Sequence, residues 1–180
     1  MQLHTSILET KINTVLSIAV ATSVVLGIGT AGLTTTIFAQ KILYNHFTAQ
    51  LSGSNEVPTV TTAGSGIASF QLVPIGHQEA INYQLNLKNM NGVTGAHIHN
   101  GKQGENGPVV AGLFNPSMNG PPTGPINGLL TAGTLTSSQL TGPLAGKTID
   151  NLVSMIRSGD AYVNVHTTQN QNGEVRGQIS

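Results

Sequence analysis

Apolar and polar residues alternate along most of the chain beyond residue 46, which is the pattern of strands with one buried face. The clearest case is residues 80–88, where every second side chain is apolar and the others are Asn, Gln or Lys. Further strands are predicted over residues 47–53, 66–73, 93–99, 108–114, 128–135, 160–166 and 174–179, with Pro74 ending the second. Seven or eight short antiparallel strands predict an all-β Greek-key sandwich or barrel.

One segment has helical spacing instead. Residues 148–159 place Ile149, Leu152, Val153 and Ile156 on one helix face. Thr148 or Asp150 is expected to cap its start and Gly159 its end, which predicts one short helix packed over an end of the sheets. Residues 115–128 contain four prolines and three glycines and are predicted to form a loop.

The chain begins with a long apolar segment. No charged residue occurs from Ile12 to Ala39, and lysines flank the segment at positions 11 and 41. It is long enough to cross a bilayer, which takes about 20 residues. Residues 1–40 are therefore predicted to be a signal peptide cleaved near Ala39 or an uncleaved N-terminal membrane anchor. Either places the β-domain of residues 41–180 outside the cytoplasm, secreted or anchored to the outer face of the membrane.

Charge and cysteine usage exclude several functions. Charged residues make up 8% of the chain, with seven basic against seven acidic, so there is no basic field for nucleic acid. The chain has no cysteine, which excludes a disulfide scaffold, a thiolate zinc site, an iron–sulfur cluster and a blue-copper site.

Three histidines supply the candidate chemistry. His97 and His99 lie two apart on one predicted strand and so share a face, opposite the apolar Ala96 and Ile98. His166 ends another predicted strand, where Val163 and Val165 are expected to face inward and His166 outward. An outward histidine is most often a plain surface residue, but three on matching faces predict a metal site. The loops 100–107 and 115–128 are expected to fold over it.

Three neutral imidazoles without thiolate or carboxylate suit copper, with zinc as the alternative. Zinc hydrolysis would need a general base, and Glu105 and Glu174 are the nearby carboxylates in sequence. Copper with an open position suits one-electron chemistry on a small oxygen species. His46 and His77 are candidates for a fourth ligand, although each is more typical of plain surface.

Five sequence blocks resemble the chordin-type, or CHRD, domain family. They are Leu51-Ser-Gly-Ser-Asn-Glu-Val-Pro58, Ala96-His-Ile-His-Asn-Gly101, Gly104-Glu-Asn-Gly-Pro-Val-Val-Ala111, Ala161-Tyr-Val-Asn-Val-His-Thr167 and Gly173-Glu-Val-Arg-Gly-Gln-Ile179. The resemblance runs from Phe47 to Ile179. The family occurs in animal chordins and in many microbial exported proteins, and its name supplies no reaction.

An H-x-H strand with a later histidine is also similar to the copper site of Cu,Zn superoxide dismutases. This likeness implies a Greek-key barrel of the dismutase type. The alternative fold is an immunoglobulin-like sandwich. By this likeness His97, His99 and His166 would hold copper. Arg176 would stand where an arginine draws superoxide to the metal. No cysteine pair, zinc loop or bridging histidine is present, so the site would be mononuclear.

These observations lead to two functional hypotheses. The first is an extracytoplasmic mononuclear copper protein that dismutates superoxide, with positive potential from Arg176 and Lys102 attracting the small anion. Tyr162 and Asn164 share the face of His166 and are expected to orient the ligands. The second is a non-catalytic module for surface binding, adhesion or metal carriage.

Overall fold

A computed structural model describes residues 45–180, except residues 121 and 123. The predicted signal peptide or anchor at residues 1–40 lies outside the described part. The strands are β1 (His46–Ser52), β2 (Ser65–Ile75), β3 (Gln78–Met90), β4 (Val93–Asn100), β5 (Val109–Phe114), β6 (Ile126–Leu135), β7 (Ala161–Thr167) and β8 (Val175–Gln178). The all-β prediction is confirmed.

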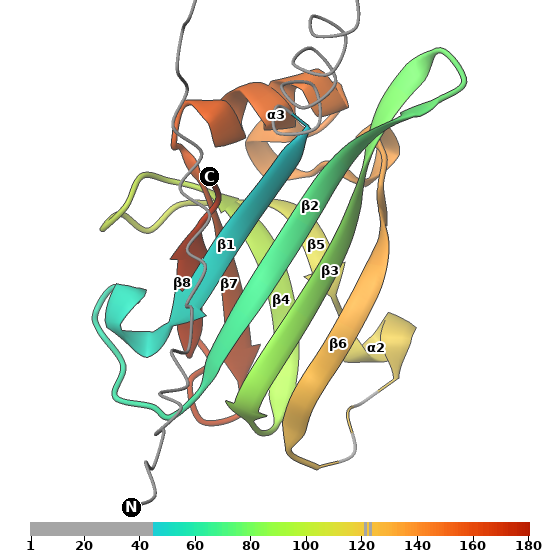
Figure 1. Ribbon diagram of the computed structural model, residues 1–180. Coiled ribbons are helices and arrows are strands. Elements are labelled where there is room, and N and C mark those ends of the chain that lie inside the picture. The colour runs from blue at the N-terminus through green and yellow to red at the C-terminus, as the bar shows by residue number, and fades with distance from the viewer. Residues whose placement is uncertain (1–44, 121, 123) are drawn as a thin grey trace, which may run out of the picture.

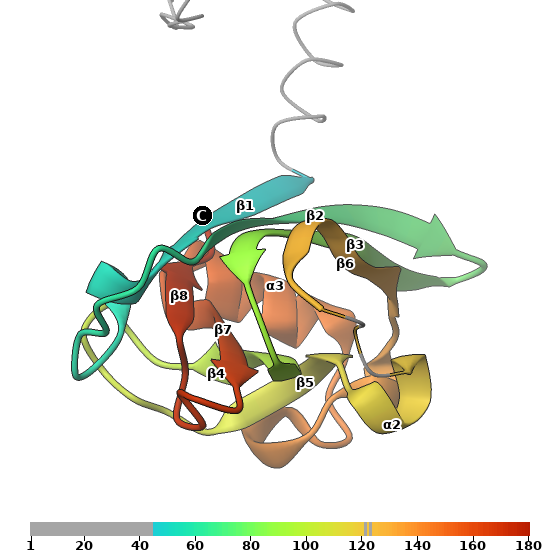
Figure 2. The same cartoon turned by 90° about the horizontal axis from the view of Figure 1, so that it is seen from below.

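The strands form one antiparallel sheet in the order β5-β4-β7-β8-β1-β2-β3-β6. Figures 1 and 2 show that the sheet curls into a near-barrel. The two edge strands, β5 and β6, come into contact. Across this seam the Tyr83 hydroxyl of β3 donates a hydrogen bond to the Leu113 carbonyl of β5 at 2.8 Å. The inward faces of the strands form the apolar core inside the barrel.

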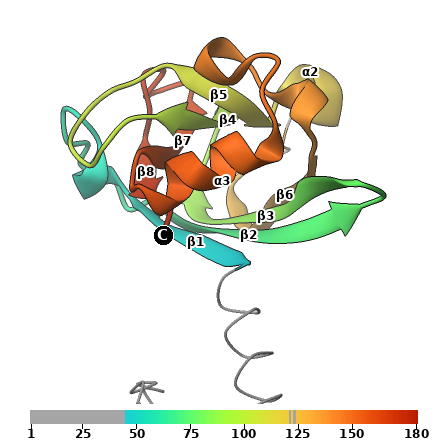
Figure 3. The ribbon, with the colours of Figure 1, turned by 90° about the horizontal axis from the view of Figure 1, so that it is seen from above.

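Helix α3 (Ile149–Arg157) covers one end of the barrel, as Figure 3 shows. Its four predicted apolar positions are all buried in the core. Thr148 begins the helix with a capping box, in which the Asn151 side chain accepts a hydrogen bond from the Thr148 backbone N–H at 3.1 Å. The prediction of this helix and of its place over an end of the sheet is confirmed.

Two boundary predictions were wrong. Pro74 does not end the second strand, because it sits near the hairpin tip, where β2 continues to Ile75 and Pro74 pairs with Glu79. The proline-rich stretch is not loop throughout. It contains the short helix α2 (Pro116–Asn119), whose Ser117 N–H is capped by the Asn115 side chain, and β6 already begins at Ile126.

Three 3-10 turns complete the described elements: η1 (Gly53–Asn55), η2 (Ser137–Gln139) and η3 (Gly142–Leu144). Among the residues that the structure describes, none of the helices is both long and apolar enough to span a membrane.

Candidate metal centre

The two histidine-bearing strands are neighbours. β4 and β7 pair antiparallel, with His97 opposite Asn164, His99 opposite Tyr162 and Gly95 opposite His166. Ala96, Ile98, Val163 and Val165 are buried in the barrel core, so the three histidines share the outer face, as predicted. The adjacency of β4 and β7, which the sequence left open, brings the histidines together.

The three imidazoles form a compact cluster. One ring nitrogen from each of His97, His99 and His166 lies within 4.8 Å of the others. Ring centroids are 5.2 Å apart for His97 and His166 and 5.9 Å apart for His97 and His99. Small rotations of the rings would bring such nitrogens to the roughly 2 Å metal–nitrogen distance of a shared ion.

Hydrogen bonds decide which nitrogens are available. His99 Nδ1 lies 2.9 Å from the Gly107 carbonyl and His166 Nδ1 lies 3.0 Å from the Gln171 carbonyl. A carbonyl can only accept, so each Nδ1 carries the proton and leaves the lone pair on Nε2. His97 Nδ1 and His99 Nε2 are buried with no hydrogen-bond partner. Unpaired buried nitrogens are unfavourable unless something binds them, and a cation fits this donor set.

Gly95 gives the His97 ring its room. A Cβ at position 95 would stand 3.1 Å from His97 Cε1, which is closer than normal contact. Because Gly95 has no side chain, the His97 ring can lean over this position toward His166, the residue opposite Gly95 on β7. The glycine therefore belongs to the site.

The environment keeps the imidazoles neutral. Burial, reinforced by His166 and His99, lowers the pKa of His97 to about 4. Burial also lowers the pKa of His99 and of His166, although a backbone carbonyl next to each ring opposes the shift. Metal ligation requires an unprotonated imidazole, so at neutral pH few protons compete with a metal.

Tyr162 and Arg176 stand behind His99. The Tyr162 ring stacks on His99 with centroids 4.9 Å apart, and the Arg176 guanidinium carbon lies 3.4 Å from the Tyr162 ring centroid. Arg176 is only 1% exposed, so it does not face solvent as an arginine that attracts a small anion would. Its face of the sheet was correct, but residues 100–108 cover it.

The covering loop fixes this stack. Arg176 donates to the carbonyls of Lys102 and Glu105 and to the Asn106 side chain, and the Tyr162 hydroxyl accepts from the Gly107 N–H at 3.1 Å. The prediction that the glycine-rich loop 100–107 folds over the site is confirmed. Tyr162 is therefore well placed to orient His99, whereas Arg176 contacts Tyr162 and not the histidines.

Asn164 lies beside the cluster, directly opposite His97 on β7, and is 3% exposed. Its amide donates to Glu56 Oε2 at 3.4 Å. Glu56 is a buried carboxylic group that the sequence pattern did not single out, although it lies within the block Leu51–Pro58 that carries the family resemblance.

The two carboxylates considered for zinc hydrolysis have different surroundings. Glu174 accepts hydrogen bonds from Thr62, Thr167 and Asn170. Burial opposes its ionisation, but these bonds outweigh burial and lower the pKa of Glu174. Glu105 is exposed on the loop. The fourth-ligand candidates His46 and His77 are also exposed, and neither belongs to the cluster among the described residues.

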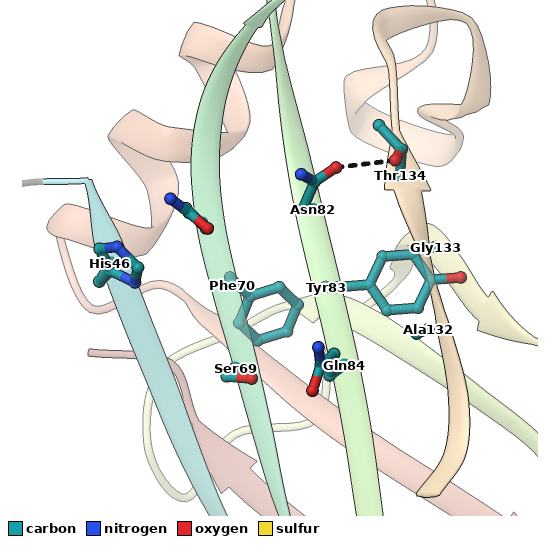
Figure 4. A pocket seen from close by; sticks show the side chains of 10 residues that line it. His46, Ser69, Phe70, Asn82, Tyr83, Gln84, Ala132, Gly133 and Thr134 are labelled. Atoms are coloured by element: carbon teal, nitrogen blue, oxygen red, sulfur yellow. Dashed lines mark hydrogen bonds between the residues drawn. The ribbon is translucent and has the colours of Figure 1, made fainter.

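Two cavities lie near the histidine-bearing sheet or on its far strands, and only one of them is lined by a histidine of the cluster. One, of about 390 Å³, is lined by His97, Tyr83, Leu113 and Met118. Met118 belongs to the stretch 115–128, so this stretch borders the same cavity as His97. Another cavity, of about 490 Å³, lies over β1, β2, β3 and β6 and is lined by none of the three histidines (Figure 4). Of these two cavities, only the smaller one borders a residue of the histidine cluster.

The comparisons with known proteins give one match. The family model described as CHRD domain matches residues 47–179, well over half of the chain. No curated protein and no solved structure matches. The matched range contains all three histidines and Glu56.

Proposed function

The chain belongs to the CHRD domain family, and from this premise we propose that it is an extracytoplasmic mononuclear copper-binding protein that dismutates superoxide to O₂ and hydrogen peroxide. One observation carries the proposal, which is the convergence of three imidazoles of which two present buried, unpartnered nitrogens. The ligating atoms would be His97 Nδ1, His99 Nε2 and His166 Nε2.

Copper and zinc both fit this donor set, and copper is the one of the two that would also supply redox chemistry. Imidazole is a good ligand for copper and zinc, and the site offers no thiolate or ionised carboxylate. Three protein ligands leave a position open for a small molecule. When bound, copper would supply one-electron redox chemistry that oxidises one superoxide and reduces a second.

The chain's own residues would hold the geometry. The Gly107 and Gln171 carbonyls fix the tautomers of His99 and His166, and the Tyr162 ring holds the plane of His99. Arg176 would act by clamping Tyr162 and adding positive potential from behind the ring, since it does not reach the histidines.

The location of Arg176 favours a second candidate function. Arg176 is buried behind Tyr162 and does not stand beside the open position, and a metal carrier or surface binding module needs no such guiding cation. In this alternative the same histidines would bind copper or zinc without turnover. An extracytoplasmic site is supported by the family, which occurs in chordins and in exported microbial proteins.

The test is metal stoichiometry together with superoxide consumption in the purified protein. We expect one copper per chain and rapid consumption of superoxide. His97→Ala or His166→Ala should each weaken copper binding by more than about 100-fold, the upper end of the loss caused by removing an outer partner of a ligand. Both variants should retain the β-sheet circular dichroism of the parent.

His77→Ala is the matched control, because His77 is exposed in the β2–β3 turn and should leave binding and turnover unchanged. One bound copper without superoxide consumption would support the carrier function. Failure to bind micromolar copper or zinc would overturn both the dismutase and the metal-carrier functions and would leave the surface binding module.

A further inference from the structure

Glu56 lies in a buried polar patch that the proposed redox site does not use. It follows η1 and is 5% exposed, although a carboxylate is rarely buried without strong partners. It also belongs to the block Leu51–Pro58, which the three histidines do not explain.

Asn164 connects Glu56 to the histidine face. Its strand neighbours are His97 on β4 and Arg176 on β8, so its side chain stands in a row between them. The Asn164 amide nitrogen donates to Glu56 Oε2. A Cβ on Gly173 would overlap both Asn164 Oδ1 and Glu56 Oε1, so the backbone there closes tightly over the two side chains.

Two oxygens in this pair have no partner. Glu56 Oε1 and Asn164 Oδ1 are both buried and unbonded. An ionised carboxylate can only accept, so both oxygens would stay unsatisfied if Glu56 were charged. A protonated Glu56 can donate from Oε1 to Asn164 Oδ1 while Oε2 accepts from the amide nitrogen. That cyclic acid–amide pair satisfies both oxygens.

Arg176 does not neutralise Glu56 by contact. Its guanidinium donates hydrogen bonds to the Asn106 side chain and to the carbonyls of Lys102 and Glu105. Burial raises the pKa of Glu56 to about 7, against the opposing effects of Arg176, Asn164 and the Val57 N–H. The other titratable groups near the row are Glu174, His97 and His166.

We propose that Glu56 is a neutral carboxylic acid paired with Asn164, and that it releases its proton when a divalent cation occupies the histidine cluster. The second half rests on the metal centre of the proposed function. A cation near the pair favours the charged carboxylate, so Glu56 acts as a proton store for the site.

The acid–amide pair is tested without metal, by unfolding the full-length protein between pH 4.5 and 8. Native Glu56 keeps its proton up to about pH 7, whereas the unfolded carboxyl loses it near pH 4.5. The native state thus binds more protons in this window, and the parent should lose stability relative to Glu56→Gln as pH rises. The introduced amide would mimic the neutral acid, so the Glu56→Gln variant should match the parent at pH 4.5.

Glu174→Gln is the matched control. Glu174 accepts three hydrogen bonds and has a lowered pKa, so this variant should be less stable than the parent at neutral pH. If Glu56→Gln is also destabilised at neutral pH, or if its difference from the parent does not change with pH, Glu56 is ionised in the native state and the pair is overturned.

The coupling is tested with Zn²⁺, which is redox-inert, by measuring protons released on binding at pH 6.5 in weak buffer. The parent should release up to one proton per zinc more than Glu56→Gln, since both share the same histidines. Equal release would overturn the coupling. Absence of zinc binding would overturn the metal centre and the coupling together, while the pH series would still decide the acid–amide pair.

Discussion

At the scale of single residues, the site is defined by burial of polar atoms. The His97 ring is half-buried next to the rings of His166 and His99, and its buried Nδ1 has no hydrogen-bond partner. The cost of desolvating a charged imidazole keeps the ring neutral. Backbone carbonyls in turn fix the proton of His99 and of His166 on Nδ1.

This burial predicts a pH-dependent stability for the metal-free protein. The folded pKa of His97 is about 4 and the unfolded value is 6.5, so the unfolded state binds more protons between these values. The stability linked to His97 is complete above pH 6.5 and is lost as pH falls toward 4. Unfolding of His97→Asn should therefore show a smaller loss across this range than the parent.

The comparison must be made between variants, because Glu56 has the opposite sign. Its raised pKa favours the folded state at low pH, which partly hides the effect of His97 in the parent. Because Glu56 offsets part of the loss, Glu56→Gln alone should steepen the loss of stability as pH falls from 6.5, and adding His97→Asn should reduce that loss again. A His97→Asn profile parallel to the parent between pH 4 and 6.5 would contradict the neutral, buried imidazole.

At the scale of elements, alternation in the sequence predicted which residues share a face but not which strands are neighbours. The apolar phase of Ala96 and Ile98 and of Val163 and Val165 correctly placed the histidines outward. Pairing of β4 with β7 joins segments that lie far apart in the chain, and no local pattern specifies it. Local periodicity shows which side chains share a face of the sheet, but it does not show which loops cover that face.

Because periodicity does not show what covers the sheet, the sequence did not reveal that Arg176 is buried, and it did not single out Glu56. Both are outer-face or loop residues that become buried only because loop 100–108 and the segment after β1 fold over the sheet. A charged side chain on the outer face of a sheet normally stays in solvent unless protein partners replace the water. Those partners are mostly backbone carbonyls, which every loop carries and which therefore leave no signal in the sequence.

Close packing of β8 against β1 gives a prediction at this scale. A Cβ at position 177 would overlap the Gln50 carbonyl, which is backbone and has little freedom to move. Gly177→Ala should therefore push β8 from β1 and lower the free energy of unfolding by about 1–3 kcal/mol, as overpacked positions do. Chemical denaturation measures this loss directly.

Gly112→Ala is the matched control, because a Cβ there meets nothing within 4 Å. Gly112 is also in a strand, on β5 opposite His97, so the two substitutions differ mainly in available space. The control should be neutral or slightly stabilising, since alanine restricts the unfolded chain. Equal destabilisation by both substitutions would show that strand glycine as such, and not the approach of β8 to β1, is required.

At the scale of the whole molecule, the barrel is closed by a side chain rather than by a strand ladder. The sheet order ends at β5 and β6, and between them the Tyr83 ring passes over Gly133 of β6 to bond the Leu113 carbonyl of β5. Figure 4 shows the Tyr83 ring lying across Gly133. His97, Tyr83 and Leu113 line the same cavity, so the seam lies next to the proposed metal centre.

Tyr83→Phe removes this bond while keeping the ring. The loss of one hydrogen bond should lower the free energy of unfolding by about 1 kcal/mol. Backbone hydrogen exchange should accelerate selectively on β5 and β6, because the seam loses the hydrogen bond that joins β3 to β5. Copper should also dissociate faster, since β5 flanks the strand that carries His97.

Thr134→Val is the control for this prediction. It deletes the hydrogen bond from Thr134 to Asn82, which is exposed on the outer face and joins strands that already pair. Exchange on β5 should therefore stay unchanged. If Tyr83→Phe leaves exchange on both edge strands at the parent rate, the hydroxyl does not close the barrel, and packing of β5 against β6 must hold the seam by itself.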